Sequence, residues 1–199
     1  EIIRGMMEDF TELLRQVTEN PEIKIRDINT RRSGNDFEWN NTHTIYPKDS
    51  SLHELISQKT REYPQKNAIS FRNKNISYQD LNERANRLAN LLIKRGIQKG
   101  DRIALALDRS EELIIALLGI MKSGAAYVPL DPAYPKKQIE YMLKDASARI
   151  LLTSSAYQNK FSSESEEIIL EDIQNELKEC SKEDPTVAVN GSDLAYVIY

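Results

Sequence analysis

The stretch Met121-Lys-Ser-Gly-Ala-Ala-Tyr-Val-Pro-Leu-Asp-Pro132 contains the end of a helix, a strand and a turn in immediate succession. The run that leads into it, Leu113–Met121, is apolar on every side, which is typical of a helix buried between two layers. Gly124 predicts the end of that helix, because glycine readily adopts the left-handed conformation found there. Ala126–Leu130 predicts a strand that the prolines of the stretch close. A helix that passes directly into a strand is typical of an α/β fold.

The segment before this stretch alternates in the same way. Ser77 and Asp80 have the spacing of a capping box, in which two side chains satisfy the first amides of a helix, and Gly96 ends that helix. Ser110 predicts the cap of the next helix. The elements expected here are, in order, a helix over 52–63, a strand over 67–72, a turn at 73–75, a helix over 77–95 and a strand over 102–107.

The segment after this stretch continues the alternation. Pro135 predicts the start of a helix whose inward face carries Ile139, Met142 and Leu143. The elements expected after it are a strand over 148–153, a mobile loop over 154–166, a short strand over 168–170, a helix over 171–179 and a buried strand over 194–199. Strands that alternate with helices predict a mostly parallel sheet flanked by helices, so the expected fold class is α/β.

The first part of the chain has a different pattern. Residues 2–17 carry apolar side chains at spacings of three and four, which predicts an amphipathic helix that Asn20-Pro21 ends. Its polar face is acidic, so we expect it to pack on a neighbouring domain rather than on a membrane. A polar linker follows, in which Phe37 and Trp39 are expected to pin the chain to a surface.

Composition excludes several classes of function. The net charge is −4, from 27 basic and 31 acidic residues, which argues against nucleic acid as a partner. The basic pairs Arg31-Arg32 and Lys136-Lys137 are interpreted as solvated surface. No apolar run approaches the roughly 20 residues that cross a bilayer. A single cysteine, Cys180, cannot form an internal disulfide, which fits a reducing, cytoplasmic location.

No catalytic, cofactor-binding or metal-binding residue is predicted from motifs. The glycine-rich phosphate-binding patterns and the Gly-x-Ser-x-Gly elbow are missing from the sequence. Cys180 has no histidine nearby, and His43 and His53 lack further ligands at metal-binding spacing. Ser154-Ser155 has no histidine partner, and the adjacent acids Glu111-Glu112 and Glu166-Glu167 are interpreted as solvated or helix-end charges.

Three segments carry a resemblance to a known family. Ile76–Asn86 resembles the first core motif of amino-acid adenylation domains, Met121–Pro132 resembles the second nearly residue for residue, and Leu194–Tyr199 resembles the strand that leads into the third, a phosphate loop. Shorter matches fall in the family's order at Asp108-Arg109-Ser110, Leu118-Gly119-Ile120 and Tyr134-Pro135. The chain therefore resembles a piece of a nonribosomal peptide synthetase, of the kind that makes peptide antibiotics.

The resemblance implies a domain order. Residues 1–26 resemble the C-terminal end of a condensation domain, and 27–51 resemble the linker to an adenylation domain. Residues 52–199 resemble the N-terminal part of an adenylation domain, incomplete and truncated before the phosphate loop. Gly124, Tyr127, Pro129 and Asp131 belong to the second motif, and we expect each to shape the backbone rather than to take part in chemistry.

The resemblance also implies an activity for the complete enzyme, an ATP-dependent ligase. It condenses an amino acid with ATP, in the presence of Mg²⁺, to an aminoacyl adenylate. It then passes the aminoacyl group to the phosphopantetheine thiol of a carrier domain. The implied partners are the upstream condensation domain, the rest of the adenylation domain and the carrier domain. Because the catalytic motifs of the family lie beyond Tyr199, we expect this segment alone to be inactive and to bind no cofactor.

Two alternatives stay open at this point. The chain could be a docking or scaffold fragment that binds a condensation domain through its first 50 residues. It could also belong to an acyl-CoA or aryl acid ligase, although a tail that resembles a condensation domain argues against that class. The sequence does not indicate which amino acid is activated.

Overall fold

The computed structural model describes residues 2–29 and 41–199, and the chain divides into two compact units, Glu1–Tyr46 and Pro47–Tyr199. The first unit contains the helix α1, Ile2–Glu19, and a short 3-10 turn, Ile25–Asp27. The helix α1 confirms the amphipathic helix expected over 2–17. Its apolar stripe is exposed within this unit, including Met7 and Phe10. The pair Arg31-Arg32 and both linker aromatics, Phe37 and Trp39, lie outside the described residues.

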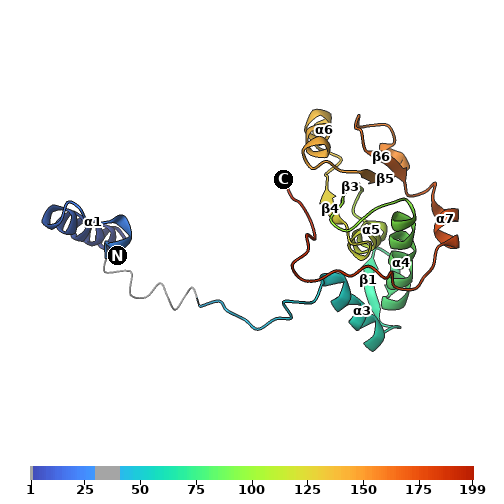
Figure 1. Cartoon of the computed structure of the whole chain (residues 1–199), viewed down its shortest axis with the longest axis horizontal. Coiled ribbons are helices and arrows are strands. Elements are labelled where there is room, and N and C mark those ends of the chain that lie inside the picture. Colours follow the sequence, from blue (N-terminus) through green and yellow to red (C-terminus); the bar gives the residue numbers. More distant parts are fainter. Residues whose placement is uncertain (1, 30–40) are drawn as a thin grey trace. The chain divides into compact units, whose positions relative to one another are not determined.

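The second unit is an α/β domain (Figure 1). Its helices are α3, Leu52–Glu62; α4, Tyr78–Lys94; α5, Glu111–Lys122; α6, Lys136–Asp145; and α7, Gln174–Glu179. Its strands are β1, Asn67–Phe71; β2, Lys74–Ser77; β3, Arg102–Ala106; β4, Ala126–Pro129; β5, Ile150–Thr153; and β6, Glu166–Ile169. A 3-10 turn, Ser155–Tyr157, lies in the loop between β5 and β6.

The four strands β4-β3-β5-β6 form a parallel sheet in that spatial order. The chain therefore crosses from β3 to β4 on one side and then passes over to β5 on the other. This order confirms the expected α/β fold, with a parallel sheet flanked by helices. The register places Ile103 beside Tyr127 on β4 and beside Ile150 on β5.

The sheet has an apolar layer on each face. The helices α4 and α5 cover one face, where Ile103, Leu105 and Leu152 join the core. The helix α6 covers the other face, where Ala104 and Leu151 pack against Ile139, Met142 and Leu143. Successive residues of a strand point to opposite faces, and so the strands that are buried on both sides are almost continuously apolar.

One strand was not expected from the sequence. The segment 73–75 was predicted to be a turn, but Lys74–Ser77 forms β2 and pairs in antiparallel register with β1. The turn lies earlier, at Arg72-Asn73, where Arg72 has a φ of 52°. The prediction was wrong because an arginine in the left-handed region gives no local signal, whereas asparagine is a common turn residue.

The final segment also differs from its prediction. Residues 194–199 were expected to form a buried strand, but only an isolated parallel bridge joins Tyr196 to Tyr127 of β4. Leu194 and Ile198 are 50% and 66% exposed. An apolar, β-branched run predicts burial from composition, but burial requires a layer on both sides, and this segment lies at the edge of β4 (Figure 1).

Two further boundaries shift. The strand β6 begins at Glu166, earlier than the expected 168–170. Its first two residues are glutamates, which the sequence did not indicate as a strand, but both pair with the buried strand β5 at the edge of the sheet. The helix α7 begins at Gln174 rather than at 171. The boundary between the two units, at Tyr46 and Pro47, falls inside the segment 27–51 that resembles a linker.

Candidate functional site

The motif residues of 121–132 contact other parts of the same chain. Gly124 has a φ of +82°, and a Cβ added there would lie 2.8 Å from Cγ1 of Val187, so both conformation and space favour glycine. Pro129 ends β4, and the Asp131 carboxylate accepts a hydrogen bond of 2.9 Å from the amide of Ala133 in the turn that follows. These contacts support the expectation that these residues shape the backbone, which stays a prediction.

Tyr127 lies at the contact between β4 and the final segment. Its ring centroid is 5.6 Å from that of Tyr196. Its amide donates to the carbonyl of Ala195 at 3.1 Å, and its carbonyl accepts from the amide of Val197 at 3.0 Å. Burial, followed by the nearby Tyr196 hydroxyl, raises the pKa of Tyr127. The residue therefore holds the final segment through both its backbone and its ring.

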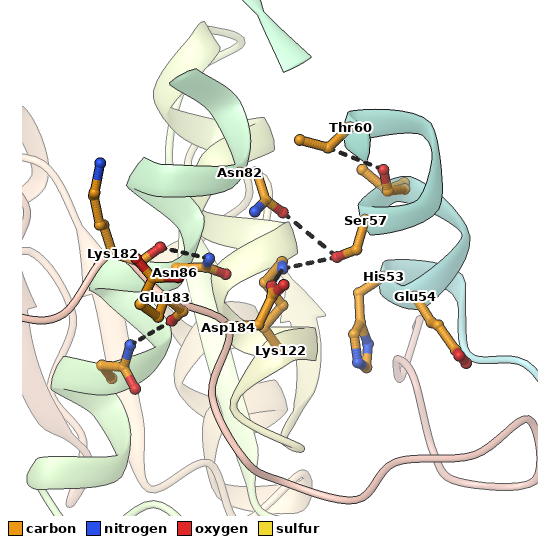
Figure 2. Close-up of polar contacts among 12 residues, drawn as sticks. His53, Glu54, Ser57, Thr60, Asn82, Asn86, Lys122, Lys182, Glu183 and Asp184 are labelled. Atoms are coloured by element: carbon orange, nitrogen blue, oxygen red, sulfur yellow. Dashed lines mark hydrogen bonds and ion pairs between the residues drawn. The ribbon is translucent and has the colours of Figure 1, made fainter. Parts of the chain in front are cut away.

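The same motif contains a charged side chain that is almost completely buried, Lys122, the last residue of α5 (Figure 2). Its side chain is 1% exposed. Its ammonium donates to the hydroxyl of Ser57 on α3 at 3.0 Å and forms an ion pair with the carboxylate of Asp184. Sequence reasoning passed over this lysine. The signal that could have found it was a single charge directly after the apolar run Leu113–Met121.

Burial and pairing act on this ion pair in opposite directions. Burial lowers the pKa of Lys122, and the hydrogen bond and charge of Asp184 offset this only in part. Burial alone would raise the pKa of Asp184, but the hydrogen bond and charge of Lys122 outweigh it and lower that pKa. The carboxylate therefore stays ionised beside the ammonium. Burial, followed by the charge of Lys122, also lowers the pKa of His53.

A cavity of about 300 Å³ lies beside this pair, between α3 and the segment that follows α7. Its polar lining includes His53, Glu54 and Arg61, together with both members of the ion pair. One wall is formed by the apolar residues Pro185, Val187 and Val189. The cavity is walled by the C-terminal segment itself, so its shape depends on where that segment lies.

The strand order of the parallel sheet indicates a second candidate site. In open parallel sheets, ligands bind outside the carboxyl ends of the strands where the strand order reverses. Here that point lies between β3 and β5, and there the hydroxyl of Tyr157 donates to the Asp108 carboxylate at 2.8 Å. This hydrogen bond raises the pKa of Tyr157. Tyr157 lies in a polar loop, so no pattern in the sequence singled it out.

The remaining candidates are placed as follows. Cys180 is half-buried at the end of α7, where its carbonyl accepts from Arg87. The hydroxyl of Ser155 donates to Glu171, and Ser154 precedes it at the start of the 3-10 turn. His43 lies in the first unit, and His53 lies in the first turn of α3 in the second.

The adjacent acids have separate partners. Glu111 pairs with Lys74 of β2, whereas Glu112 pairs with Arg84 of α4. In the second pair, Glu166 contacts Arg95, and the carboxylate of Glu167 accepts from the amide of Asn159. Neither pair brings its two carboxylates toward a common point, and their interpretation as solvated or helix-end charges stays a prediction. Among residues 2–29 and 41–199, no cluster of histidine, cysteine and acidic side chains has the composition of a metal site, and no helix could cross a membrane.

Comparison with known proteins places this geometry in a family. The chain matches the model of AMP-binding enzymes over residues 56–199, well over half of its length. It is 34% identical over 204 residues to tyrocidine synthase 2 of Brevibacillus parabrevis, an alignment that covers 100% of the chain and 6% of that protein. The chain belongs to the AMP-binding enzyme family.

Solved structures agree with this match. The AMPPNP-bound form of the nonribosomal peptide synthetase FmoA3 has a TM-score of 0.77 at 25% identity, over 100% of the chain and 22% of that protein. The N-terminal subdomain of Klebsiella oxytoca NpsA, in complex with 3-hydroxybenzoyl-AMSN, has a TM-score of 0.67 at 25% identity, over 78% of the chain and 39% of that one. The chain therefore spans only a small part of the length of the relatives it matches.

Proposed function

Because the chain belongs to the AMP-binding enzyme family, we propose that it forms the N-terminal part of an amino-acid adenylation domain in a nonribosomal peptide synthetase. The observation that carries this proposal is the match along the whole chain to tyrocidine synthase 2 and to the nonribosomal peptide synthetase FmoA3, together with a fold shared with the N-terminal subdomain of NpsA. The relatives reported above favour this class over a docking fragment or an acyl-CoA ligase.

The proposed reaction joins the carboxylate of an amino acid to the α-phosphate of ATP and releases pyrophosphate. The aminoacyl group then passes from AMP to the phosphopantetheine thiol of a carrier domain. Such a reaction requires the carboxylate to be held in line with the phosphate while charge builds on pyrophosphate. In this proposal the sheet and its helices provide a rigid frame for that geometry, and the reacting groups are held by other parts of the enzyme.

Such a reaction uses magnesium. In the part of the chain that the structure describes, no group of three histidine, cysteine or acidic side chains could hold a metal ion. The segment alone is expected to be inactive, because the resemblance puts the motifs that hold the reacting groups beyond Tyr199. A cytoplasmic location stays a prediction that rests on the single cysteine.

The test is amino-acid-dependent exchange of pyrophosphate into ATP. We expect the complete protein that carries this chain to catalyse exchange, and we expect the 199-residue chain by itself to show none. The intact mass of each preparation is measured first, so that activity is assigned to a chain of known length. Robust exchange by the verified short chain would show that the active groups lie within it. This would overturn the proposal that other parts of the enzyme hold the reacting groups.

A second proposal concerns the first unit. Residues 1–26 would form the end of a condensation domain, joined through 27–51 to the adenylation part from 52. The exposed apolar stripe of α1 supports it, since such a stripe is buried in a stable assembly. Deletion of residues 1–50 should then abolish binding of a separately added condensation domain. Unchanged binding after this deletion would refute the proposal.

The acceptor distinguishes the remaining alternative. A carrier-domain thiol as acceptor supports a peptide synthetase, whereas transfer to coenzyme A would support an acyl-CoA ligase. Both acceptors can be offered to the same adenylate, and the products can be separated by mass.

A further inference from the structure

The segment from 181 to 199 crosses the second unit almost without secondary structure. It leaves α7, runs past α4 and the end of α5, and reaches β4, where a single bridge pairs Tyr196 with Tyr127 (Figure 1). A chain without its own helix or ladder has few backbone hydrogen bonds to fix its path. Backbone hydrogen bonds tie it to the domain at Gly191, whose amide donates to the carbonyl of Asp49, and at Tyr127, which bonds Ala195 and Val197. Before Gly191, the position of the segment depends mainly on side chains that reach it from the domain.

The anchors lie in two groups. In the first, Asn86 donates to the carbonyl of Lys182 at 2.8 Å, and Asn90 donates to the carbonyls of Ser181 and Glu183 at 2.9 and 3.1 Å (Figure 2). These amides come from neighbouring turns of α4. They hold the start of the segment, and the side chain of Asn86 also hydrogen-bonds that of Asp184.

In the second group, Lys99 donates to the carbonyl of Ala188 at 3.0 Å and pairs with Asp193 at 2.7 Å. Gly124 lies against Val187, where a Cβ would come within 2.8 Å of the valine. These contacts hold the middle of the segment on two turns that lie side by side, the one before β3, which carries Lys99, and the one between α5 and β4, which carries Gly124. Lys99 is 42% exposed, so water competes for its contacts.

Lys122 lies between the two groups and differs from the other anchors in its burial. Its ammonium is held by Ser57, which itself donates to Asn82 at 3.4 Å, so that α3, α4 and α5 meet at this point (Figure 2). The one member of this cluster that belongs to the C-terminal segment is Asp184. An ion pair on a buried and rigidly held ammonium defines position more sharply than one between two mobile, solvated side chains.

The stability of the fold does not by itself explain why a lysine occupies position 122. An apolar side chain of similar size would fill the same volume without the cost of burying a charge, and such replacements are often neutral or stabilising. The ammonium charge of Lys122 is favourable only where an opposite charge lies beside it, and that charge is the carboxylate of Asp184. The carboxylate is half exposed, so it does not itself need the lysine for its solvation.

We propose that Lys122 is a positioning residue: through Asp184 it fixes the path of residues 184–199 and hence the register in which the final segment meets β4. If the proposed function is correct, this segment leads into the phosphate loop of the adenylation reaction. Lys122 then places that loop for ATP without touching it. The placement of the phosphate loop rests on the proposed function, whereas the effect of Lys122 on the path of residues 184–199 does not.

The variants for a test are Lys122→Met, which keeps the length and removes the charge, and Asp184→Asn, which keeps the shape at a half-exposed site. The control is Lys136→Met, which removes an exposed lysine of α6 that pairs with Glu140. Each is made in the complete protein that carries this chain. The Asp184 variant decides the question if the Lys122 variant fails to fold.

The first readout is hydrogen–deuterium exchange followed by mass spectrometry. We expect the amides of 185–199 that are hydrogen-bonded to the domain, those of Gly191 and Val197, to exchange at least about tenfold faster in both variants, with peptides of β3 and β5 unchanged. The control should match the unmodified protein everywhere. Unchanged exchange over 185–199 in the Asp184 variant overturns the positioning role, whether or not the protein is an adenylating enzyme.

The second readout separates the reaction from the fold. In pyrophosphate exchange we expect the KM for ATP to rise by about tenfold and the KM for the amino acid to change by less than about twofold. A merely structural lysine would lower the amount of active enzyme and leave both KM values unchanged. Faster hydrogen exchange with an unchanged KM for ATP overturns the role in the reaction. An unmodified enzyme without any exchange activity refutes the proposed function alone.

Discussion

At the scale of the residue, Lys122 and Asp184 show how burial and charge are balanced in this domain. The lysine has a lowered pKa because burial disfavours its charged form. The aspartate has a lowered pKa because the neighbouring ammonium outweighs its burial. Burial thus destabilises the charged form of the lysine, whereas pairing stabilises the charged form of the aspartate.

The aspartate predicts a pH dependence of stability. Its folded pKa lies below the ordinary value of 3.8, so the ionised carboxylate stabilises the folded state above that value. The contribution is lost as the pH falls below 3.8 and through the folded pKa. We expect Asp184→Asn to lower the free energy of unfolding at neutral pH and to have no effect in strong acid.

Urea denaturation at a series of pH values measures this difference. The control is Glu164→Gln, which changes an exposed acid in the loop before β6. Its effect should be small at every pH. A difference for Asp184→Asn that persists unchanged into strong acid would contradict the assignment of the stabilising charge to this carboxylate.

Gly119 is a second residue whose environment leads to a prediction. It lies on α5 against α4, and an added Cβ would lie 2.9 Å from Cδ2 of Leu88 and 3.1 Å from the carbonyl oxygen of Ala85. We expect Gly119→Ala to cost about 1–3 kcal/mol of unfolding free energy through overpacking. Over most of this range the cost exceeds the gain of about 1 kcal/mol that alanine has over glycine in a helix.

Chemical denaturation of a double-mutant cycle checks the cause. In a Leu88→Ala background, the substitution at Gly119 should cost less by at least about 0.5 kcal/mol, because the closest atom has been removed. The Cβ of Leu88, 3.0 Å from the added Cβ, stays in alanine, so an equal cost in both backgrounds would mean that Cδ2 of Leu88 is not what opposes the added methyl group.

At the scale of the element, the helix starts are set by serine hydroxyls. Ser77 accepts from the amide of Asp80 at 3.1 Å at the start of α4, and Ser110 accepts from the amide of Leu113 at 3.3 Å at the start of α5. These bonds satisfy amides that have no partner within the helix. Both caps were predicted from the sequence and are confirmed.

Loss of either cap should be measurable. We expect Ser77→Ala and Ser110→Ala each to lower the free energy of unfolding by about 1 kcal/mol. Ser163→Ala, in the exposed loop before β6, serves as the matched control and should stay within about 0.5 kcal/mol of the unmodified chain. Thermal and urea denaturation of the three variants test this. Cap variants no less stable than the control would show that other contacts fix the helix starts.

At the scale of the whole second unit, the final segment leaves apolar surface in contact with solvent. Leu194, Tyr196 and Ile198 are 50%, 51% and 66% exposed along a segment that bridges β4. An exposed apolar edge favours association with other chains. We expect the 199-residue chain to associate as its concentration rises.

Sedimentation or light scattering across a concentration series measures that association. The paired substitutions Leu194→Lys and Ile198→Lys should reduce it by placing charge on the edge. Ile25→Lys, at an exposed site of the first unit, should leave it unchanged. A chain that stays monomeric at high concentration without any substitution would contradict the prediction.

The sequence by itself determined the features that depend on near neighbours. The capping serines, the glycine after α5 and the apolar faces of α4 and α6 are local patterns, and each predicted its element correctly. The order of strands and helices then indicated a parallel sheet, because parallel strands require crossover connections. The resemblance of 121–132 to a core motif led to the family, which the match over 56–199 establishes.

Only the tertiary structure decided which side chains meet across long stretches of sequence. Lys122 lies in the recognised motif, yet its partners Ser57 and Asp184 come from α3 and from the segment after α7. The same holds for Tyr127, which contacts Tyr196. Periodicity reports which face of an element is apolar, but not which distant segment covers it. Residues 194–199 therefore had the composition of a buried strand, although in the described fold they make a single bridge to β4 and contact α6 through Val197 and the hydroxyl of Tyr199.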